Sequence, residues 1–269
     1  MNKTGKRIHF IAIGGSVMHN LAIELHKSGN QVTGSDDYIF DPSKSRLAQH
    51  GLLPESFGWY PEKITSEIEA VILGMHARPD NPELQQAREL GLEIYSFPEY
   101  LYQCHQNKKR VVIGGSHGKT TITSMVMHVL RYHQQDFDYM VGAALEGFES
   151  SVKITNEAPL VILEGDEYLS SPVDARSKFL HYRPHIGVIT GIAWDHINIF
   201  KTFDDYVKVF DEFAASFQAG GTLIYHEGDA LVRKIGEQPA AGVTHLGYHT
   251  HPYRVTQGQT MLLTDHCGE

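Results

Sequence analysis

Short apolar runs alternate with amphipathic segments along the first hundred residues, and few folds accept this order. Residues 7–15, RIHFIAIGG, form an apolar run that ends in two glycines. Residues 16–30 then place apolar side chains at helical spacing before a Gly-Asn stop. The same succession of strand and helix continues to about residue 105. It predicts an α/β fold with a doubly wound parallel sheet.

A charged segment, QNKKR at residues 106–110, interrupts this pattern, which then starts again with another apolar strand and another helix. From about residue 243 onward the composition favours short strands. A chain of 269 residues accommodates two ordinary domains. We therefore predict a Rossmann-like parallel-sheet domain at 1–107 and a second α/β domain, which carries a glycine-rich loop, at 108–269.

The balance of charged residues limits the kinds of partner that this protein can bind. The chain has 23 basic and 32 acidic residues and a net charge of −9, which argues against nucleic acid as its main partner. No run of about 20 apolar residues is present, so we expect no membrane span. The two cysteines, Cys104 and Cys267, are far apart and belong to no metal-binding pair, as is typical of reduced thiols in a cytoplasmic protein.

The glycine-rich loop VVIGGSHGKTT, residues 111–121, resembles a phosphate-binding loop but lacks its leading glycine. In the common G-x-x-x-x-G-K-[ST] pattern the position of Ile113 holds a glycine. The context still favours a nucleotide over a mere glycine-rich turn, because a strand precedes the loop and a helix follows it. Backbone amides would surround the phosphates, Lys119 would reach their terminal oxygens, and the Thr120 hydroxyl would bind Mg²⁺. The predicted ATP-binding residues are Gly115, Ser116, His117, Gly118, Lys119, Thr120 and Thr121.

An earlier glycine loop lies at the first junction of strand and helix, where unpaired N–H groups favour an anion. It lacks the full dinucleotide pattern, so glycines that merely permit a tight turn are an equal alternative. Asp36, at the end of the second strand, could accept a ribose hydroxyl or simply cap a helix. The candidate binding residues here are Gly14, Gly15, Ser16, Val17, Met18 and Asp36.

Acidic and histidine side chains follow two later strands. Glu164, Asp166 and Glu167 come after one apolar run, and Asp195 and His196 come after the next. Because parallel strands end at one edge of a sheet, we expect Glu164 and His196 to meet Thr120 around Mg²⁺. The alternatives are an ordinary loop carboxylate for Glu164 and a hydrogen-bonded structural histidine for His196.

A basic cluster lies at residues 176–183, in RSKFLHYR. Arg176 and Lys178, together with His181 and Arg183, form a candidate contact for a substrate anion such as a carboxylate. A solvated charged loop is the alternative.

These motifs resemble the Mur ligase superfamily, the ATP-dependent amide ligases of cell-wall peptide assembly, whose loop reads G-[TS]-[HN]-G-K-[TS]. GSHGKT at 115–120 fits that form, which also lacks the leading glycine. EGDEY at 164–168, RSKFLHYRP at 176–184 and WDHINIF at 194–200 are most similar to the murein peptide ligase branch. That branch joins UDP-N-acetylmuramate to the tripeptide L-alanyl-γ-D-glutamyl-meso-diaminopimelate.

The resemblance implies a role for each motif. The loop from Gly14 to Met18 and Asp36 would hold the UDP moiety, and Lys119 the β- and γ-phosphates of ATP. His117 would face the lactyl carboxylate of the muramate. Lys119, Glu164, His196 and His117 would be the catalytic residues, and Thr120, Glu164 and His196 the Mg²⁺ ligands.

The resemblance also implies a third domain that binds the incoming amino acid or peptide, and this chain ends before it. We therefore expect a UDP-sugar-binding domain and an incomplete ATP-binding central domain that by themselves do not complete catalysis. Two other functions stay open. One is the sister ligase that adds L-alanine to UDP-N-acetylmuramate, and the other is a non-catalytic nucleotide- or UDP-sugar-binding module.

Overall fold

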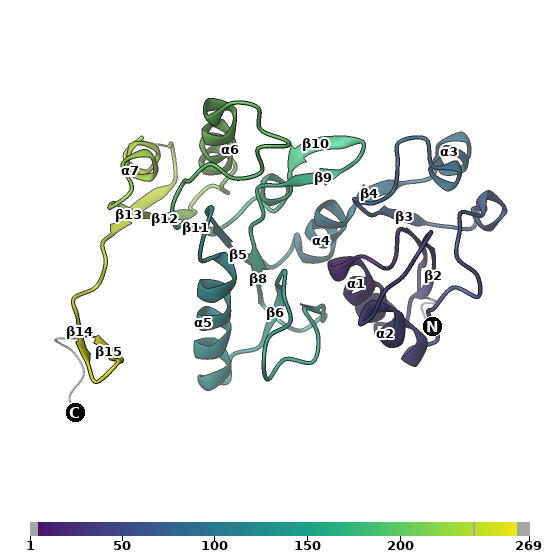
Figure 1. Cartoon of the computed structure of the whole chain (residues 1–269), viewed down its shortest axis with the longest axis horizontal. Coiled ribbons are helices and arrows are strands. Elements are labelled where there is room, and N and C mark those ends of the chain that lie inside the picture. Colours follow the sequence, from purple (N-terminus) through teal and green to yellow (C-terminus); the bar gives the residue numbers. More distant parts are fainter. Residues whose placement is uncertain (1–4, 239, 263–269) are drawn as a thin grey trace.

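A computed structural model describes residues 5–238 and 240–262, which form two α/β lobes (Figure 1). The predicted fold class is confirmed. The first lobe has a four-stranded parallel sheet in the order β2-β1-β3-β4. Its elements are β1 (Arg7–Ile11), α1 (Ser16–Lys27), β2 (Gln31–Ser35), α2 (Ser43–Gln49), η1 (Pro61–Lys63), β3 (Ala70–Leu73), α3 (Pro82–Glu89), β4 (Ile94–Ser96) and α4 (Phe97–His105).

Successive side chains of the central strands point to opposite faces of this sheet, and both faces are buried. Phe10 and Ile72 pack with Leu21 of α1 on one face, whereas Val71 packs with Leu84 of α3 on the other. Strands that are apolar on both faces require helices on both sides, which explains the near-continuous apolar runs in the sequence.

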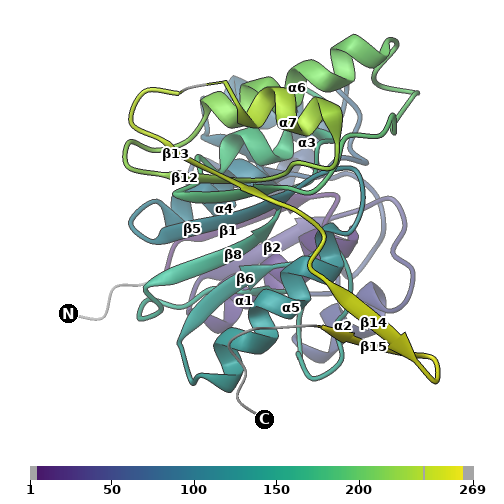
Figure 2. The same cartoon turned by 90° about the vertical axis from the view of Figure 1, so that its left-hand side faces the viewer.

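The second lobe has a seven-stranded, mostly parallel sheet in the order β13-β12-β11-β5-β8-β6-β7, in which only β7 runs antiparallel. Helices α6 and α7 lie on one side of it and α5 on the other (Figure 2). The elements are β5 (Lys109–Gly114), α5 (Lys119–Tyr132), β6 (Phe137–Met140), β7 (Val152–Lys153), β8 (Leu160–Glu164), β9 (Leu169–Ser171), β10 (Asp174–Ser177), η2 (Lys178–His181), β11 (Ile186–Ile189), α6 (Phe203–Ala215), β12 (Thr222–His226), α7 (Ala230–Gly236) and β13 (Thr244–Tyr248).

Strands β14 (Tyr253–Thr256) and β15 (Gln259–Leu262) form an antiparallel hairpin and, within the described residues, pair only with each other. They agree with the strand-like composition expected at the end of the chain. Cys267 lies outside the described residues. Cys104 is half-buried, and burial raises the pKa of its thiol to about 12.

Several short elements escape the sequence patterns. Strands β6 and β7 are too short for a periodic signal, and β6 contains the buried charge of Asp138. Residues 174–181, for which a charged loop was one alternative, form β10 and the 3-10 helix η2. We propose the domain boundary near residue 107, because α4 ends at His105 and the second sheet begins at Lys109.

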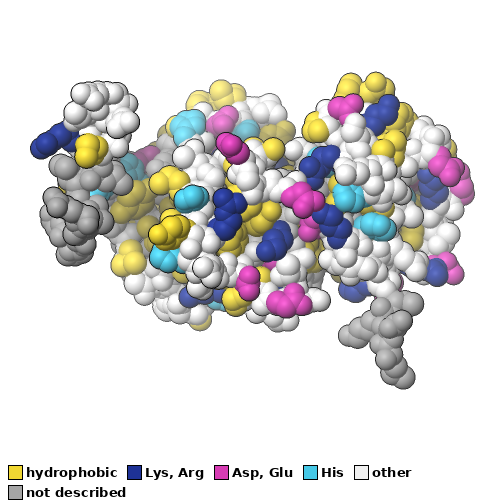
Figure 3. All heavy atoms as spheres, turned by 90° about the horizontal axis from the view of Figure 1, so that it is seen from below, with side chains coloured by type: hydrophobic (Ala, Val, Ile, Leu, Met, Phe, Trp, Pro, Cys, Tyr) yellow, Lys and Arg dark blue, Asp and Glu magenta, His cyan; other side chains and the backbone are white. Residues whose placement is uncertain are grey.

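No helix in the described part of the chain is both long and apolar enough to cross a membrane. On the face shown in Figure 3, basic and acidic side chains are interspersed. That face therefore has no broad basic surface of the kind that a nucleic acid requires.

Candidate functional site

The candidate phosphate-binding loop connects β5, near the middle of the larger sheet, to α5. Two of its residues must be glycine. Gly115 has φ +128°, and a Cβ there would lie 2.0 Å from Thr190 Oγ1. Gly118, the N-cap residue directly before α5, has φ +77°. The loop is also hydrogen-bonded to the next strand end, since the Ser116 N–H donates to the carbonyl of Gly191 at 2.9 Å.

Lys119 is the first residue of α5 and points back across the loop. Its ammonium group donates to the Gly115 carbonyl at 2.7 Å and to Glu167 Oε2 at 2.8 Å. The Lys119 side chain is largely buried, and that of Glu167 is fully buried. A buried charge is stable only when it is paired, so Glu167 holds Lys119 beside the loop.

Thr120 lies beside Glu164, which ends β8. The Thr120 hydroxyl donates to Glu164 Oε1 at 3.0 Å, and the Gly142 N–H donates to Oε2 at 3.2 Å. A hydroxyl and a carboxylate are both suitable Mg²⁺ ligands, so this pair fits the expected ion. The ligand role of this pair stays a prediction.

His196 contacts Glu167 rather than Thr120. Its Nε2 lies 3.6 Å from Glu167 Oε1 and 3.9 Å from Asp195 Oδ2, and its ring meets Tyr168 edge-on at 4.9 Å. Oxygen and nitrogen atoms of Asp166, Glu167 and His196 lie within 4.8 Å of one another, a grouping that could hold a metal ion. Glu167, the carboxylate partner of Lys119, belongs to this grouping as well.

His117 is exposed at the top of the loop, and its carbonyl accepts a hydrogen bond from Thr190 Oγ1 at 2.7 Å. Thr121, the third residue of α5, is also exposed. Neither side chain lines the cavity that lies between the two lobes. The proposed contact of His117 with a substrate carboxylate stays a prediction.

In the first lobe, the glycine loop and Asp36 lie together. The buried Asp36 carboxylate accepts the Gly14 N–H at 2.7 Å, and a Cβ on Gly14 would approach Ile39 at 2.9 Å. Burial raises the pKa of Asp36, although the Gly14 hydrogen bond opposes this, and the neighbouring Asp37 raises it further. Asp36 therefore shapes the glycine turn, whichever ligand the turn binds. A second hollow beside Asp36 exposes the rings of Tyr38 and Phe40.

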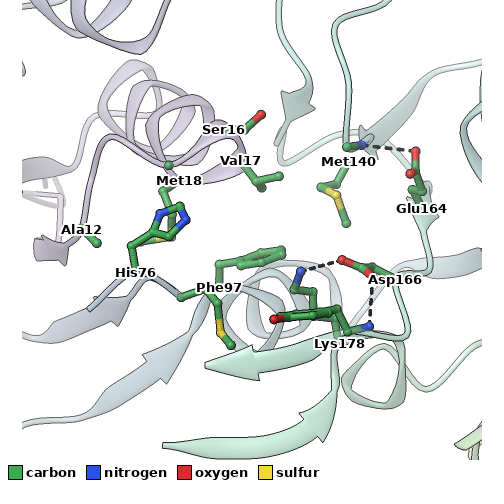
Figure 4. A pocket seen from close by; sticks show the side chains of 14 residues that line it. Ala12, Ser16, Val17, Met18, His76, Phe97, Met140, Glu164, Asp166 and Lys178 are labelled. Carbon is green, nitrogen blue, oxygen red and sulfur yellow. Dashed lines mark hydrogen bonds and ion pairs between the residues drawn. The ribbon is translucent and has the colours of Figure 1, made fainter. Parts of the chain in front are cut away.

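The two lobes face each other across a cavity of about 280 Å³. Figure 4 shows Ser16, Val17 and Met18 at the start of α1 opposite Glu164 and Asp166 of the second lobe. The cavity thus joins the candidate UDP-sugar residues to the strand ends of the larger sheet. Ligands of open α/β sheets bind at such strand ends.

The basic cluster at 176–183 is paired with carboxylates. Lys178 lines the cavity and lies 2.5 Å from Asp166 Oδ2, and Arg176 donates to Asp174 Oδ2 at 2.7 Å and to Glu99 Oε1 at 2.9 Å. Burial alone raises the pKa of Asp166, but Lys178 reverses the effect, so the net pKa is lowered. Of the two candidate anion contacts, only Lys178 borders the cavity.

The remaining members of the cluster are also engaged. His181 Nε2 lies 3.3 Å from Asp174 Oδ2, and burial lowers the pKa of His181. The Arg183 guanidinium lies over the ring of Tyr102, 5.4 Å from its centroid.

The sequence motifs assign no role to two side chains at the loop, Glu167 and Tyr206. Glu167 is visible only as the last acidic residue of EGDE, where nothing marks it as buried. Tyr206 falls at helical spacing with Phe210 and Phe213, which predicts core packing, yet its hydroxyl reaches both Ser116 and Glu167.

The fold and its loop define an α/β protein of the P-loop class with a second, Rossmann-like lobe. Residues 113–262 match the family model described as Mur ligase middle domain, and residues 7–109 match Mur ligase family, catalytic domain. The chain belongs to the Mur ligase family.

Two curated relatives are named UDP-N-acetylmuramate–L-alanine ligase. The protein from Clostridium acetobutylicum is 32% identical over 247 residues, which cover 91% of this chain and 52% of that protein. The protein from Syntrophomonas wolfei is 31% identical over 232 residues, covering 86% of this chain and 48% of that protein. The chain thus spans about half the length of the curated relatives it matches.

Two solved structures are similar to this one. The UDP-N-acetylmuramate:L-alanyl-gamma-D-glutamyl-meso-diaminopimelate ligase from Neisseria meningitides has a TM-score of 0.83 at 24% identity, covering 96% of this chain and 84% of that chain. The UDP-N-acetylmuramate-alanine ligase from Thermotoga maritima has a TM-score of 0.67 at 26% identity, covering 86% of this chain and 51% of that chain. At 24% identity the first likeness shows the shared fold alone.

Proposed function

We propose that this chain is the UDP-sugar- and ATP-binding portion of a ligase that activates the carboxylate of UDP-N-acetylmuramate. The observation that carries the proposal is the cavity between the lobes, which places the glycine loop of α1 opposite Glu164 at the phosphate-loop edge. A sugar nucleotide held by the first lobe would present its carboxylate to the γ-phosphate of ATP. Attack by the carboxylate oxygen would break the bond between the β- and γ-phosphates, which gives an acyl phosphate and ADP. An amine would then attack the acyl carbon, lose a proton and expel phosphate, which leaves an amide bond.

The residues of this chain would supply positioning and charge neutralisation. Backbone amides of the loop and Lys119 would hold the phosphates, and charge at the transferred phosphoryl group would be offset there. Thr120 and Glu164 would hold Mg²⁺, which would supply positive charge against the negative phosphate oxygens. Lys178, paired with Asp166, would line the path of the muramoyl group.

L-alanine is the incoming amine that the named curated relatives support. The murein tripeptide is a second candidate, supported by RSKFLHYRP at 176–184, part of which borders the cavity through Lys178. The selecting residues would lie in the third domain that the resemblance implies.

Phosphate release tests the proposed activity. With MgATP and UDP-N-acetylmuramate present, we expect the gene product that contains this chain to release phosphate when either L-alanine or the tripeptide is added. The amine that gives the larger kcat/KM identifies the ligase. The 269-residue chain alone should bind UDP-N-acetylmuramate without tripeptide-dependent phosphate release. Robust turnover by it would contradict the expected need for a third domain.

A further inference from the structure

A network of hydrogen-bonded side chains runs beneath the phosphate-binding loop, and the hydroxyl of Tyr206 is at its centre. Tyr206 is fully buried in α6. Its oxygen lies 2.7 Å from Ser116 Oγ and 2.9 Å from Glu167 Oε1. Ser116 Oγ in turn accepts the Ala193 N–H at 2.8 Å. This network therefore links the three loops that follow β5, β8 and β11.

The number of protons fixes the direction of each hydrogen bond. The carboxylate of Glu167 accepts only, so the Tyr206 hydroxyl donates to it. Tyr206 has one proton and must therefore accept from the Ser116 hydroxyl, whose oxygen receives the Ala193 N–H. Every polar side-chain atom of this network therefore has a hydrogen-bond partner. Buried networks of this kind hold their members in one arrangement.

Aromatic packing fixes the ring that carries the hydroxyl. Tyr206 meets Phe200 edge-on at 5.2 Å and Phe210 edge-on at 5.4 Å, and Phe210 meets Phe179 at 5.6 Å. The position of the hydroxyl is therefore set by the hydrophobic core rather than by the loop. Burial raises the pKa of Tyr206 and the negative charge of Glu167 adds to the effect, so the proton needed for this pattern is retained at neutral pH.

We propose that Tyr206 is a positioning residue for the phosphate-binding loop. Its hydroxyl fixes Ser116 of the loop relative to Glu167, and Glu167 fixes the ammonium group of Lys119. The loop and its lysine are thereby arranged before a phosphate arrives, which reduces the ordering cost of binding. Only the identity of the ligand, a nucleoside triphosphate, rests on the proposed function.

Amide hydrogen exchange without nucleotide tests the loop directly. Tyr206→Phe removes one hydroxyl and should speed exchange about five- to tenfold at Ser116, at Ala193 and at neighbouring loop amides, as expected for one lost hydrogen bond. The chain offers a matched control in Tyr182→Phe, because Tyr182 is fully buried and its hydroxyl has no hydrogen-bond partner among the described residues. Unchanged loop exchange in Tyr206→Phe, or equal acceleration in both variants, would overturn the proposal.

Calorimetry with MgATP and with AMP separates positioning from general stability. Lys119 and the loop act on the terminal phosphates, so Tyr206→Phe should lower the ratio of ATP to AMP affinity about five- to tenfold. Tyr182→Phe should leave that ratio unchanged, and Ser116→Ala combined with Tyr206→Phe should be no worse than the larger single effect. Equal losses for ATP and AMP would overturn the positioning role. If the unaltered chain binds no MgATP, the proposed function fails and the exchange result alone decides the inference.

Discussion

At the scale of single residues, several charged groups of this chain are held by one nearby partner. Asp36 holds the first glycine turn through the Gly14 N–H, and Glu167 holds Lys119 beside the second. In both loops a buried carboxylate shapes glycine-rich backbone that faces a cavity or a candidate phosphate site. The glycines permit the turn, and the carboxylate selects one of its conformations.

Asp36 should make stability depend on pH. Burial raises its pKa in the folded protein, so folding favours the protonated form. The stability gained from that proton is present below pH 3.8, the ordinary pKa of an Asp side chain, and is lost as pH rises through the raised pKa. Asp36→Asn keeps an oxygen for the Gly14 N–H and should therefore become more stable relative to the unaltered protein as pH rises through this window.

Urea unfolding between pH 3.5 and 7 measures this difference. Asp211→Asn, on the exposed side of α6, is the control and should show no such trend. A difference in free energy of unfolding that stays constant with pH for Asp36→Asn would mean that its ionisation is not coupled to folding.

At the scale of elements, a buried carboxylate in β6 joins four segments. Asp138 lies 2.5 Å from Lys108 Nζ, and it accepts the N–H and the hydroxyl of Thr155 at 3.0 and 2.9 Å. His105, the last residue of α4, lies 3.3 Å away. Burial alone raises the pKa of Asp138, but His105, Lys108 and Thr155 reverse the effect and lower it overall.

Asp138→Asn should reduce the free energy of unfolding at pH 7 by about 3 kcal/mol, because it leaves the largely buried side chain of Lys108 without its charge partner. The stabilisation by Asp138 is present above pH 3.8 and is lost as pH falls through its lowered pKa. The difference between variant and unaltered protein should therefore shrink in acid. Denaturant unfolding checks this, with exposed Asp136→Asn as the control. Equal destabilisation by both substitutions would refute the special role of Asp138.

At the scale of the whole molecule, the link between the lobes is more ordered than a charged linker suggests. Arg110 is buried, and its guanidinium donates to the carbonyls of Tyr182 and Gln106, each at 2.8 Å, and of His105 at 3.1 Å. Arg176 of β10 and Glu99 of α4 form a second contact between the lobes. Residues of both lobes line the cavity, whereas Lys119 belongs to the second lobe alone.

Lys119→Ala should separate the two proposed ligands. We expect ATP affinity to fall about 100-fold or more, since charge-assisted hydrogen bonds to the phosphates are lost. Affinity for UDP-N-acetylmuramate should stay within about twofold, because its candidate residues lie on α1 and at Asp36. Calorimetric titration with each ligand measures both, and Lys208→Ala, an exposed lysine of α6, is the control. Loss of both affinities would mean that the two sites are not separate.

The fold class and the positions of both glycine loops could be predicted because they depend on local patterns. Apolar runs of strand length, helical spacing and glycines at junctions are set by neighbours in the chain. The pairing of Thr120 with Glu164 follows nearly as directly, since both lie where adjacent parallel strands end. RSKFLHYRP was visible as a motif, but its basic side chains carry no sign in the sequence of the carboxylates that pair with them.

By itself, the sequence determined two α/β units, a glycine-rich loop before Lys119, and a set of acidic and histidine residues at strand ends. Only the tertiary structure decided which of these side chains meet. It brought His196 to Glu167 rather than to Thr120, paired Lys178 with Asp166, and placed the Tyr206 hydroxyl under the loop. The physical reason is that burial and pairing of charge depend on segments distant in the chain, and periodicity records only that Tyr206 faces the core.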